Sequence, residues 1–243
     1  MILIGKRGLF AAALCFCSFL GLSAVLWAGY SLPADMTFAP AEQGGDPVWV
    51  IDAGHGGEDG GAVSADGVLE SDLNLEIASR LNDLMRFAGQ TTVLTRHDEN
   101  AIHTEGDTIR ARKASDVRNR VSLVNETENA VLLSIHQNSL PTSPVTHGAQ
   151  VFRNRQEGGE ALAAHLQEAL NYAVNSGNEK QEKKIPDTIY LMKHVTAPAA
   201  LVECGFLSNR EETQVLQTAS HQRKLATAIT AGCLRWCTGE ELP

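Results

Sequence analysis

The run VWVIDAGHGG occupies residues 48–57 and divides into two halves of different character. Its first half, VWVID, is a continuous apolar run with the length and composition of a strand that is buried on both faces. Its second half is rich in glycine and carries His55 just beyond the expected end of the strand. The run therefore predicts a central strand that delivers a polar loop to one edge of a sheet.

The chain beyond this run alternates helical patterns with further short apolar runs. Residues 73–88 repeat apolar positions at helical spacing, with Ser71 or Asp72 as the expected N-cap and Gly89 as the stop. Further strands are expected at 91–95, 130–135, 148–152 and 199–204, and further helices at 117–124, 161–174, 211–216 and 221–236. This alternation predicts a single α/β domain over 48–243, with a mostly parallel twisted sheet and helices on both faces.

The N-terminal 30 residues are predicted to form a membrane-targeting segment. Lys6 and Arg7 precede a stretch, Gly8–Tyr30, that carries no charged side chain. This stretch is longer than the apolar part of a usual signal peptide and matches one membrane-spanning helix. We therefore expect residues 1–30 to form an apolar helix that is retained as an anchor, with a cleaved signal peptide as the alternative. Residues 31–47 are the expected linker, and the leading cations predict that the domain is exported.

The charge balance excludes one class of partner. The chain has 20 Lys and Arg against 29 Asp and Glu, a net charge of −9, so it lacks the basic footprint of a protein that binds nucleic acid through bulk charge. One basic cluster stands against this background: Arg110, Arg112, Lys113, Arg118 and Arg120. It is interpreted either as a helix face with internal ion pairs or as a contact to ligand carboxylates.

Three of the expected strands carry, at or just beyond their ends, a residue that can bind a metal ion or transfer a proton, namely His55, His136 and Glu203. In open α/β sheets ligands bind outside the carboxyl ends of the strands, so these side chains are expected to converge. Glu70, at the start of the helix that follows the first strand, is a fourth candidate. Two imidazoles and one carboxylate around an open position are a ligand set of catalytic zinc. Glu203 suits a proton-transfer role, because burial at an apolar strand end raises the pKa of a carboxyl group.

Each candidate residue also has a simpler structural interpretation. A histidine after a strand is often only hydrogen-bonded, and Glu70 suits a helix N-terminus through the helix dipole. Glu203 could pair with an arginine, and the glycines after the first strand could simply form turns. The shared position of three candidates at strand ends favours the metal site.

Four segments together resemble the zinc-dependent N-acetylmuramoyl-L-alanine amidase family: VWVIDAGHGGEDGGAV, Glu70 before a helix, LLSIHQN and ALVECGFLSN. The resemblance covers residues 48–236. It implies hydrolysis of the amide between N-acetylmuramic acid and L-alanine in peptidoglycan, with one Zn²⁺ per chain on His55, Glu70 and His136 and with Glu203 as catalytic acid/base. The chain departs from the family pattern at Ala53 and Ser139, where Pro and Ala are usual. The alternatives are a zinc peptidase that cuts within the stem peptide and a non-catalytic cell-wall-binding protein.

Two further segments, EGDTIRARKASDVRNRVSLVN and IPDTIYLMKHVTAPAALVECGFLSN, are similar to the spore-cortex, germination-specific branch of that family. This similarity implies that the substrate is cortex glycan carrying stem peptides, on the outer face of a bacterial membrane on the forespore side. It also implies a cooperating deacetylase, which would complete a muramic δ-lactam. An accessory protein is a further possible partner.

Overall fold

In the computed structural model, which describes residues 45–240, six strands form one sheet. Their order across the sheet is β2 (Thr91–Leu94), β1 (Val48–Ala53), β3 (Ala130–Asn138), β6 (Ala199–Phe206), β4 (Gln150–Arg153) and β5 (Lys183–Lys184). The four strands β2, β1, β3 and β6 are parallel, whereas β4 is antiparallel to β6 and β5 is parallel to β4. The sheet is therefore mixed but mostly parallel, as predicted, because β4–β6 is the one antiparallel pairing among the described strands.

The connection between β3 and β4 explains this change of direction. A parallel connection needs a crossover of a dozen or more residues, usually a helix. No helix lies between β3 and β4 in the described chain, so the loop at 139–149 returns the chain in the opposite direction. The connection from β4 to β5 does contain a helix, and those two strands are parallel.

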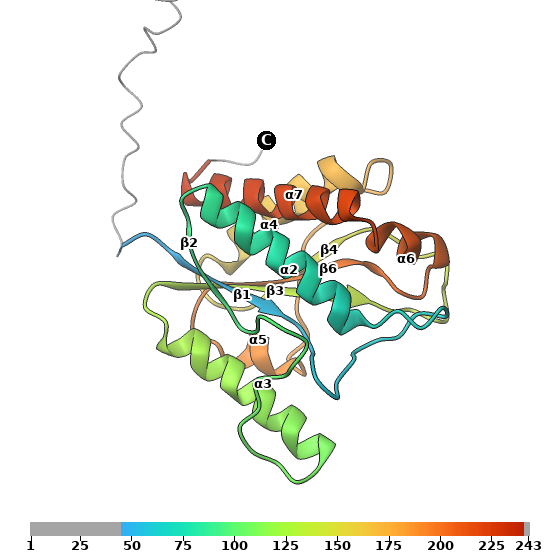
Figure 1. The fold of residues 1–243 in the computed structure, drawn as a ribbon. Helices are drawn as coiled ribbons and strands as arrows, with labels where there is room; N and C mark the ends of the chain where they lie inside the picture. The colour runs from blue at the N-terminus through green and yellow to red at the C-terminus, as the bar shows by residue number, and fades with distance from the viewer. Residues whose placement is uncertain (1–44, 241–243) are drawn as a thin grey trace, which may run out of the picture. The chain divides into compact units, whose positions relative to one another are not determined.

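Helices cover both faces of the sheet, as the sequence predicts (Figure 1). One face carries α2 (Glu70–Phe87), α4 (Gly159–Val174) and α7 (Ala219–Cys237), and the other carries α3 (Ile109–Glu126) and α5 (Tyr190–His194). Alternate residues of β1 point to opposite faces of the sheet. Trp49 and Ile51 belong to the core under α2, α4 and α7, and Val50 belongs to the core under α3 and α5. The short helix α6 (Arg210–Leu216) follows β6.

The start of α2 differs from the prediction. The N-cap is Leu69, which makes no side-chain cap, so the expectation of Ser71 or Asp72 is wrong. The loop supplies the missing acceptors instead: the Glu70 N–H donates to the Ala62 carbonyl at 2.9 Å and the Ser71 N–H to the Gly60 carbonyl at 3.1 Å. Because the loop folds back on the helix, Glu70 is its first residue.

Two strands extend further than the apolar runs suggest. β3 continues to Asn138, so His136 lies within the strand and not beyond its predicted end. β6 continues to Phe206, so Glu203 lies further inside the strand than predicted. The stop of α2 is confirmed, since Gly89 follows the helix with φ +82° and donates its N–H to the Arg86 carbonyl. The elements α5 and β5 have no counterpart in the predicted pattern.

The expected apolar helix over 1–30 and most of the expected linker lie outside the described residues. Among residues 45–240, no helix combines the length and apolar character needed to cross a membrane.

Candidate metal centre

Three of the predicted site residues meet at one point. His55 follows β1, Glu70 begins α2 and His136 lies on β3, and one potential ligand atom from each lies within 4.8 Å of the others. Glu70 Oε1 is 2.8 Å from His136 Nδ1 and 3.3 Å from His55 Nε2. The two rings stand nearly perpendicular at 78°, with centroids 5.0 Å apart. Residues far apart in the sequence thus form one cluster of nitrogen and oxygen donors.

Glycines let the backbone approach these side chains closely. A Cβ on Gly54 would lie 2.3 Å from two ring atoms of His136, and a Cβ on Gly61 would lie 2.5 Å from Glu70 Oε2. Gly61 also has φ +68°, a conformation that other residues rarely adopt. Gly54 and Gly61 therefore pack directly against the candidate metal ligands, where a larger residue would not fit.

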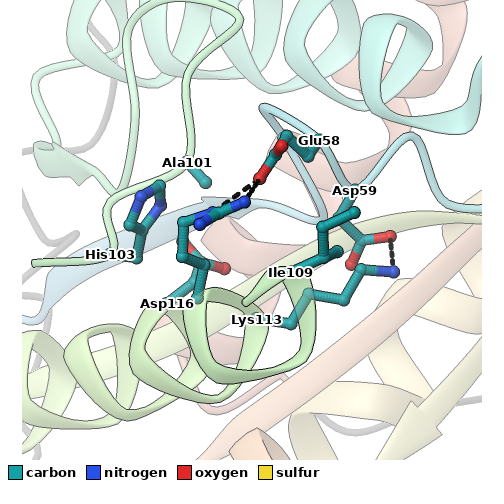
Figure 2. A pocket seen from close by; sticks show the side chains of 9 residues that line it. Glu58, Asp59, Ala101, His103, Ile109, Lys113 and Asp116 are labelled. Carbon is teal, nitrogen blue, oxygen red and sulfur yellow. Dashed lines mark hydrogen bonds and ion pairs between the residues drawn. The ribbon is translucent and has the colours of Figure 1, made fainter. Parts of the chain in front are cut away.

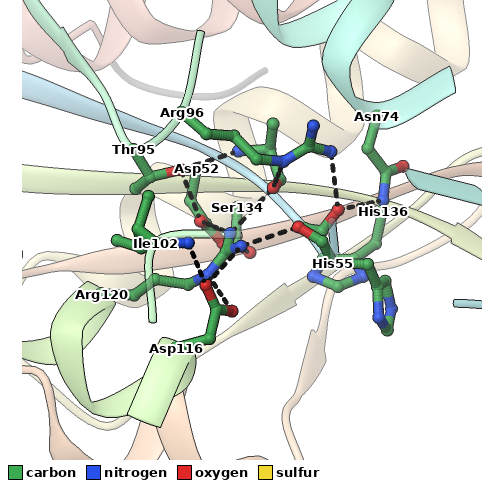
Figure 3. A network of polar contacts seen from close by, with 12 residues as sticks. Asp52, His55, Asn74, Thr95, Arg96, Ile102, Asp116, Arg120, Ser134 and His136 are labelled. Carbon is green, nitrogen blue, oxygen red and sulfur yellow. Dashed lines mark hydrogen bonds and ion pairs between the residues drawn. The ribbon is translucent and has the colours of Figure 1, made fainter. Parts of the chain in front are cut away.

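Two buried arginines hold the backbone that carries His55 (Figure 3). Arg96 donates to the carbonyls of Ala53 at 2.9 Å and Gly54 at 3.2 Å, and Arg120 donates to the carbonyl of His55 at 2.7 Å. His55 itself has φ +62°, which is uncommon for a residue other than glycine. The arginine contacts therefore stabilise an unfavourable backbone conformation at a site residue.

Arg120 is itself neutralised by carboxylates. It lies 2.5 Å from Asp52 Oδ1 and 2.8 Å from Asp116 Oδ2. Asp52 also accepts hydrogen bonds from Ser134 and Thr95, at 2.7 and 2.9 Å. Burial opposes ionisation of Asp52, but the Arg120 charge and these hydrogen bonds keep the pKa of its carboxyl below the usual value.

Glu70 is held in its ionised form. It is almost fully buried, and backbone N–H groups of Ala62 and Gln137 donate to its two oxygens at 2.8 and 3.1 Å. Burial alone would raise its pKa, yet the contacts with His136 and His55 lower it well below the usual range. The imidazoles of His136 and His55 thus contact the same carboxylate that would bind a metal ion.

The pKa of His55 is shifted in the opposite direction. Burial favours the neutral ring, but hydrogen bonds and charge from Asp59 and Glu70 outweigh it and raise the pKa of His55 to about 9. The Asp59 contact joins Oδ2 to His55 Nδ1 at 3.0 Å.

Glu203 lies beside the cluster and makes no direct contact with it by hydrogen bond or ion pair among the described residues. It is the register partner of His136 on the neighbouring strand. Its Oε2 atom is buried without a hydrogen-bond partner in the described part of the chain. Burial, together with the negative charge of Glu70, outweighs the attraction of the two histidines and raises the pKa of Glu203 to about 7.

The basic cluster of the sequence consists largely of internal ion pairs. Arg120 is buried as described, and three others form pairs at the surface: Arg112 with Glu58, Lys113 with Asp59 and Arg118 with Glu105. Sequence reasoning did not single out Asp59 or Arg96. Asp59 lies in the glycine-rich loop, four residues after His55, and no regular spacing identifies it as a contact of that histidine.

The family model for N-acetylmuramoyl-L-alanine amidase matches residues 50–235, most of the described chain. The chain belongs to this family. It is therefore a peptidoglycan N-acetylmuramoyl-L-alanine amidase, which confirms the predicted family and enzyme class.

Individual relatives agree with this assignment. The amidase is 37% identical over 189 residues to the germination-specific N-acetylmuramoyl-L-alanine amidase of Bacillus subtilis, covering 77% of this chain and 78% of that one. Its fold matches the CwlD amidase of Clostridioides difficile, solved in complex with the GerS lipoprotein, with TM-score 0.76 and 32% identity, covering 80% of this chain and all of that one. An amidase from Clostridium difficile 630 matches with TM-score 0.68 and 27% identity, covering 82% of this chain and 100% of that one.

The donor set of the amidase fits zinc. Two imidazoles and one carboxylate within 4.8 Å of one another match a ligand set of catalytic zinc, which leaves a fourth position open. The buried oxygen of Glu203 adds an unpartnered acceptor beside this set in the described structure.

Proposed function

We propose that this amidase is zinc-dependent, that His55, Glu70 and His136 hold one zinc ion, and that Glu203 is the catalytic acid/base. The observation that carries the proposal is that the three candidate metal ligands are separate from the carboxyl group of Glu203. Three donors converge on one point, while the carboxyl group of Glu203 lies on the adjacent strand with a pKa of about 7. A carboxyl group with a pKa near neutrality is suited both to accept and to donate a proton.

Zinc bound by these residues would supply Lewis acidity toward the scissile carbonyl and would lower the pKa of a water molecule. Glu203 then accepts a proton from the attacking water. It returns that proton to the L-alanine nitrogen as the amide C–N bond breaks, so that the nitrogen leaves as a neutral amine. Proton transfer of this kind contributes roughly 10²–10⁴-fold to rate.

The cellular substrate that we propose is spore-cortex glycan carrying stem peptides. The similarity to a germination-specific amidase supports this choice. Removal of the stem peptide would leave a free lactyl carboxyl group on muramic acid, and a cooperating deacetylase would expose the amine needed to close a δ-lactam. The uncharged stretch Gly8–Tyr30 supports export of the amidase to the outer face of the membrane. An accessory protein is also proposed, since the similar CwlD amidase was solved with a lipoprotein.

Mass spectrometry of digested cortex and vegetative peptidoglycan tests the proposal. Full-length protein loaded with zinc should release intact stem peptides with a free L-alanine amine and leave peptide-free muramic acid, preferentially from cortex. Chelator-stripped protein should release none until zinc is restored. Full activity after metal removal would overturn the zinc dependence, and stems that are shortened but still attached would indicate a peptidase. Equal digestion of both walls would overturn the cortex preference.

A further inference from the structure

Two neighbouring acids of the glycine-rich loop pair with two neighbouring cations of α3 (Figure 2). Arg112 Nη2 is 2.5 Å from Glu58 Oε2, and Lys113 Nζ is 2.7 Å from Asp59 Oδ1. Both pairs link the same two segments, and both are partly exposed to solvent. They are therefore closely matched in position and chemistry.

The two pairs differ in what lies beyond them. The second oxygen of Asp59, Oδ2, is 3.0 Å from Nδ1 of His55, whereas Glu58 makes no such contact among the described residues. Asp59 Oδ1 also accepts the Gly61 N–H at 3.3 Å. Asp59 is thus fixed through one oxygen by α3 and its own loop, and it presents the other to the histidine.

This contact determines which nitrogen of His55 faces the cluster. With Nδ1 engaged by Asp59, the opposite nitrogen, Nε2, points to Glu70 at 3.3 Å. The backbone cannot set this orientation alone, because the ring can rotate about its side-chain bonds. A carboxylate on the remote nitrogen fixes both the rotation of the ring and the tautomer that leaves Nε2 free as a ligand.

We propose that Asp59, held by Lys113, is a positioning residue that orients His55 for metal binding. The inference rests on the proposed zinc site and extends it to a residue outside the cluster. Carboxylates that receive the second N–H of a ligand histidine typically contribute about 10–100-fold to metal affinity. Lys113 acts one step further away, so its removal should have a smaller effect than removal of Asp59.

Zinc affinity of the full-length protein, measured at about pH 9 by competition with a chromophoric chelator, tests this inference, because protons compete little for His55 at that pH. Asp59→Ala should weaken zinc binding about 10–100-fold, with Asp59→Asn intermediate, because an amide oxygen can still accept from Nδ1 but carries no charge. Glu58→Ala is the matched control and should bind zinc as the wild type does. Circular dichroism and thermal melting check that each variant folds; if Asp59→Ala does not, Asp59→Asn provides the comparison.

A nuclear magnetic resonance signal separates positioning from general loop stability. In the zinc-loaded wild type, the Nδ1–H proton of His55 should be protected from exchange by Asp59 and visible in a long-range ¹⁵N–¹H spectrum. It should disappear in Asp59→Ala and persist in Glu58→Ala. Equal zinc affinity in folded Asp59→Ala and wild type, or an equal loss in Glu58→Ala, would overturn the inference. Failure of the wild type to bind zinc would instead overturn the proposed metal site.

Discussion

His136 on β3 and Glu203 on β6 are register partners in neighbouring parallel strands. Their side chains therefore leave the sheet on the same face, side by side. His136 also contacts Glu70 through Nδ1 at 2.8 Å, whereas the Oε2 of Glu203 is buried without a hydrogen-bond partner in the described structure. The sheet thus holds a candidate ligand and a candidate acid/base at fixed separation, while keeping Glu203 out of the donor cluster.

Gly54→Ala should disrupt the metal site without altering any donor. The added Cβ would lie 2.3 Å from the Cε1 and Nε2 atoms of His136, so the ring must move. We expect zinc affinity and amidase activity to fall together, as measured by chelator competition and peptide release. Gly67→Ala is the control, because its Cβ meets nothing within 4 Å. That variant should lose about 1–2 kcal/mol of stability through its positive φ and retain zinc. Normal zinc binding by Gly54→Ala would contradict the close packing.

Zinc affinity should rise with pH from 7 to about 9. In the metal-free protein the contacts of Asp59 and Glu70 raise the pKa of His55 to about 9, and a ligand imidazole must be neutral. Zinc must therefore displace one proton below that pH, which predicts an increase in affinity of about tenfold per pH unit. The slope should flatten as pH passes the His55 pKa. Chelator competition across this range measures it, and a pH-independent affinity between 7 and 9 would refute the protonated metal-free state.

Arg120→Met should destabilise the fold strongly. The change leaves Asp52 buried without the cation that neutralises it, and it removes the donor to the His55 carbonyl. Breaking a buried ion pair from one side costs about 3–5 kcal/mol. Arg118→Met, on the same helix, breaks only the surface pair with Glu105 and should cost roughly 0–1 kcal/mol. Urea unfolding compares the two, and equal costs would contradict the role assigned to the buried pair.

The sequence predicted the elements that periodicity defines. The strand at 48–52 and the helix that starts near Glu70 follow from apolar patterning, and parallel strands explain why His55 and His136 meet. The direction of β4 could not be read in this way, because it depends on the loop at 139–149 and not on the strand itself. The start of α2 was misplaced for a related reason: backbone carbonyls of the loop, which no side-chain pattern reveals, satisfy its first N–H groups.

The residues that support the site were harder to predict than the site itself. Arg120 lies in a strongly charged helix, where such a residue is typical of a solvated face, and its burial depends on Asp52 across the layer. Asp59 lies in an irregular loop, where spacing along the chain fixes no distance in space. In a strand or helix, the number of residues between two positions fixes the distance between them in space, whereas in a glycine-rich loop it does not.

The most direct test of the account compares zinc content and turnover in Glu203→Gln and His55→Ala. Metal analysis of the purified full-length variants, paired with stem-peptide release from peptidoglycan, gives both quantities for each protein. We predict that Glu203→Gln retains one zinc ion per chain and loses about 10²–10⁴-fold in turnover, and that His55→Ala loses both zinc and turnover. Loss of zinc in Glu203→Gln, or full turnover in either variant, would contradict the separation of ligands from acid/base.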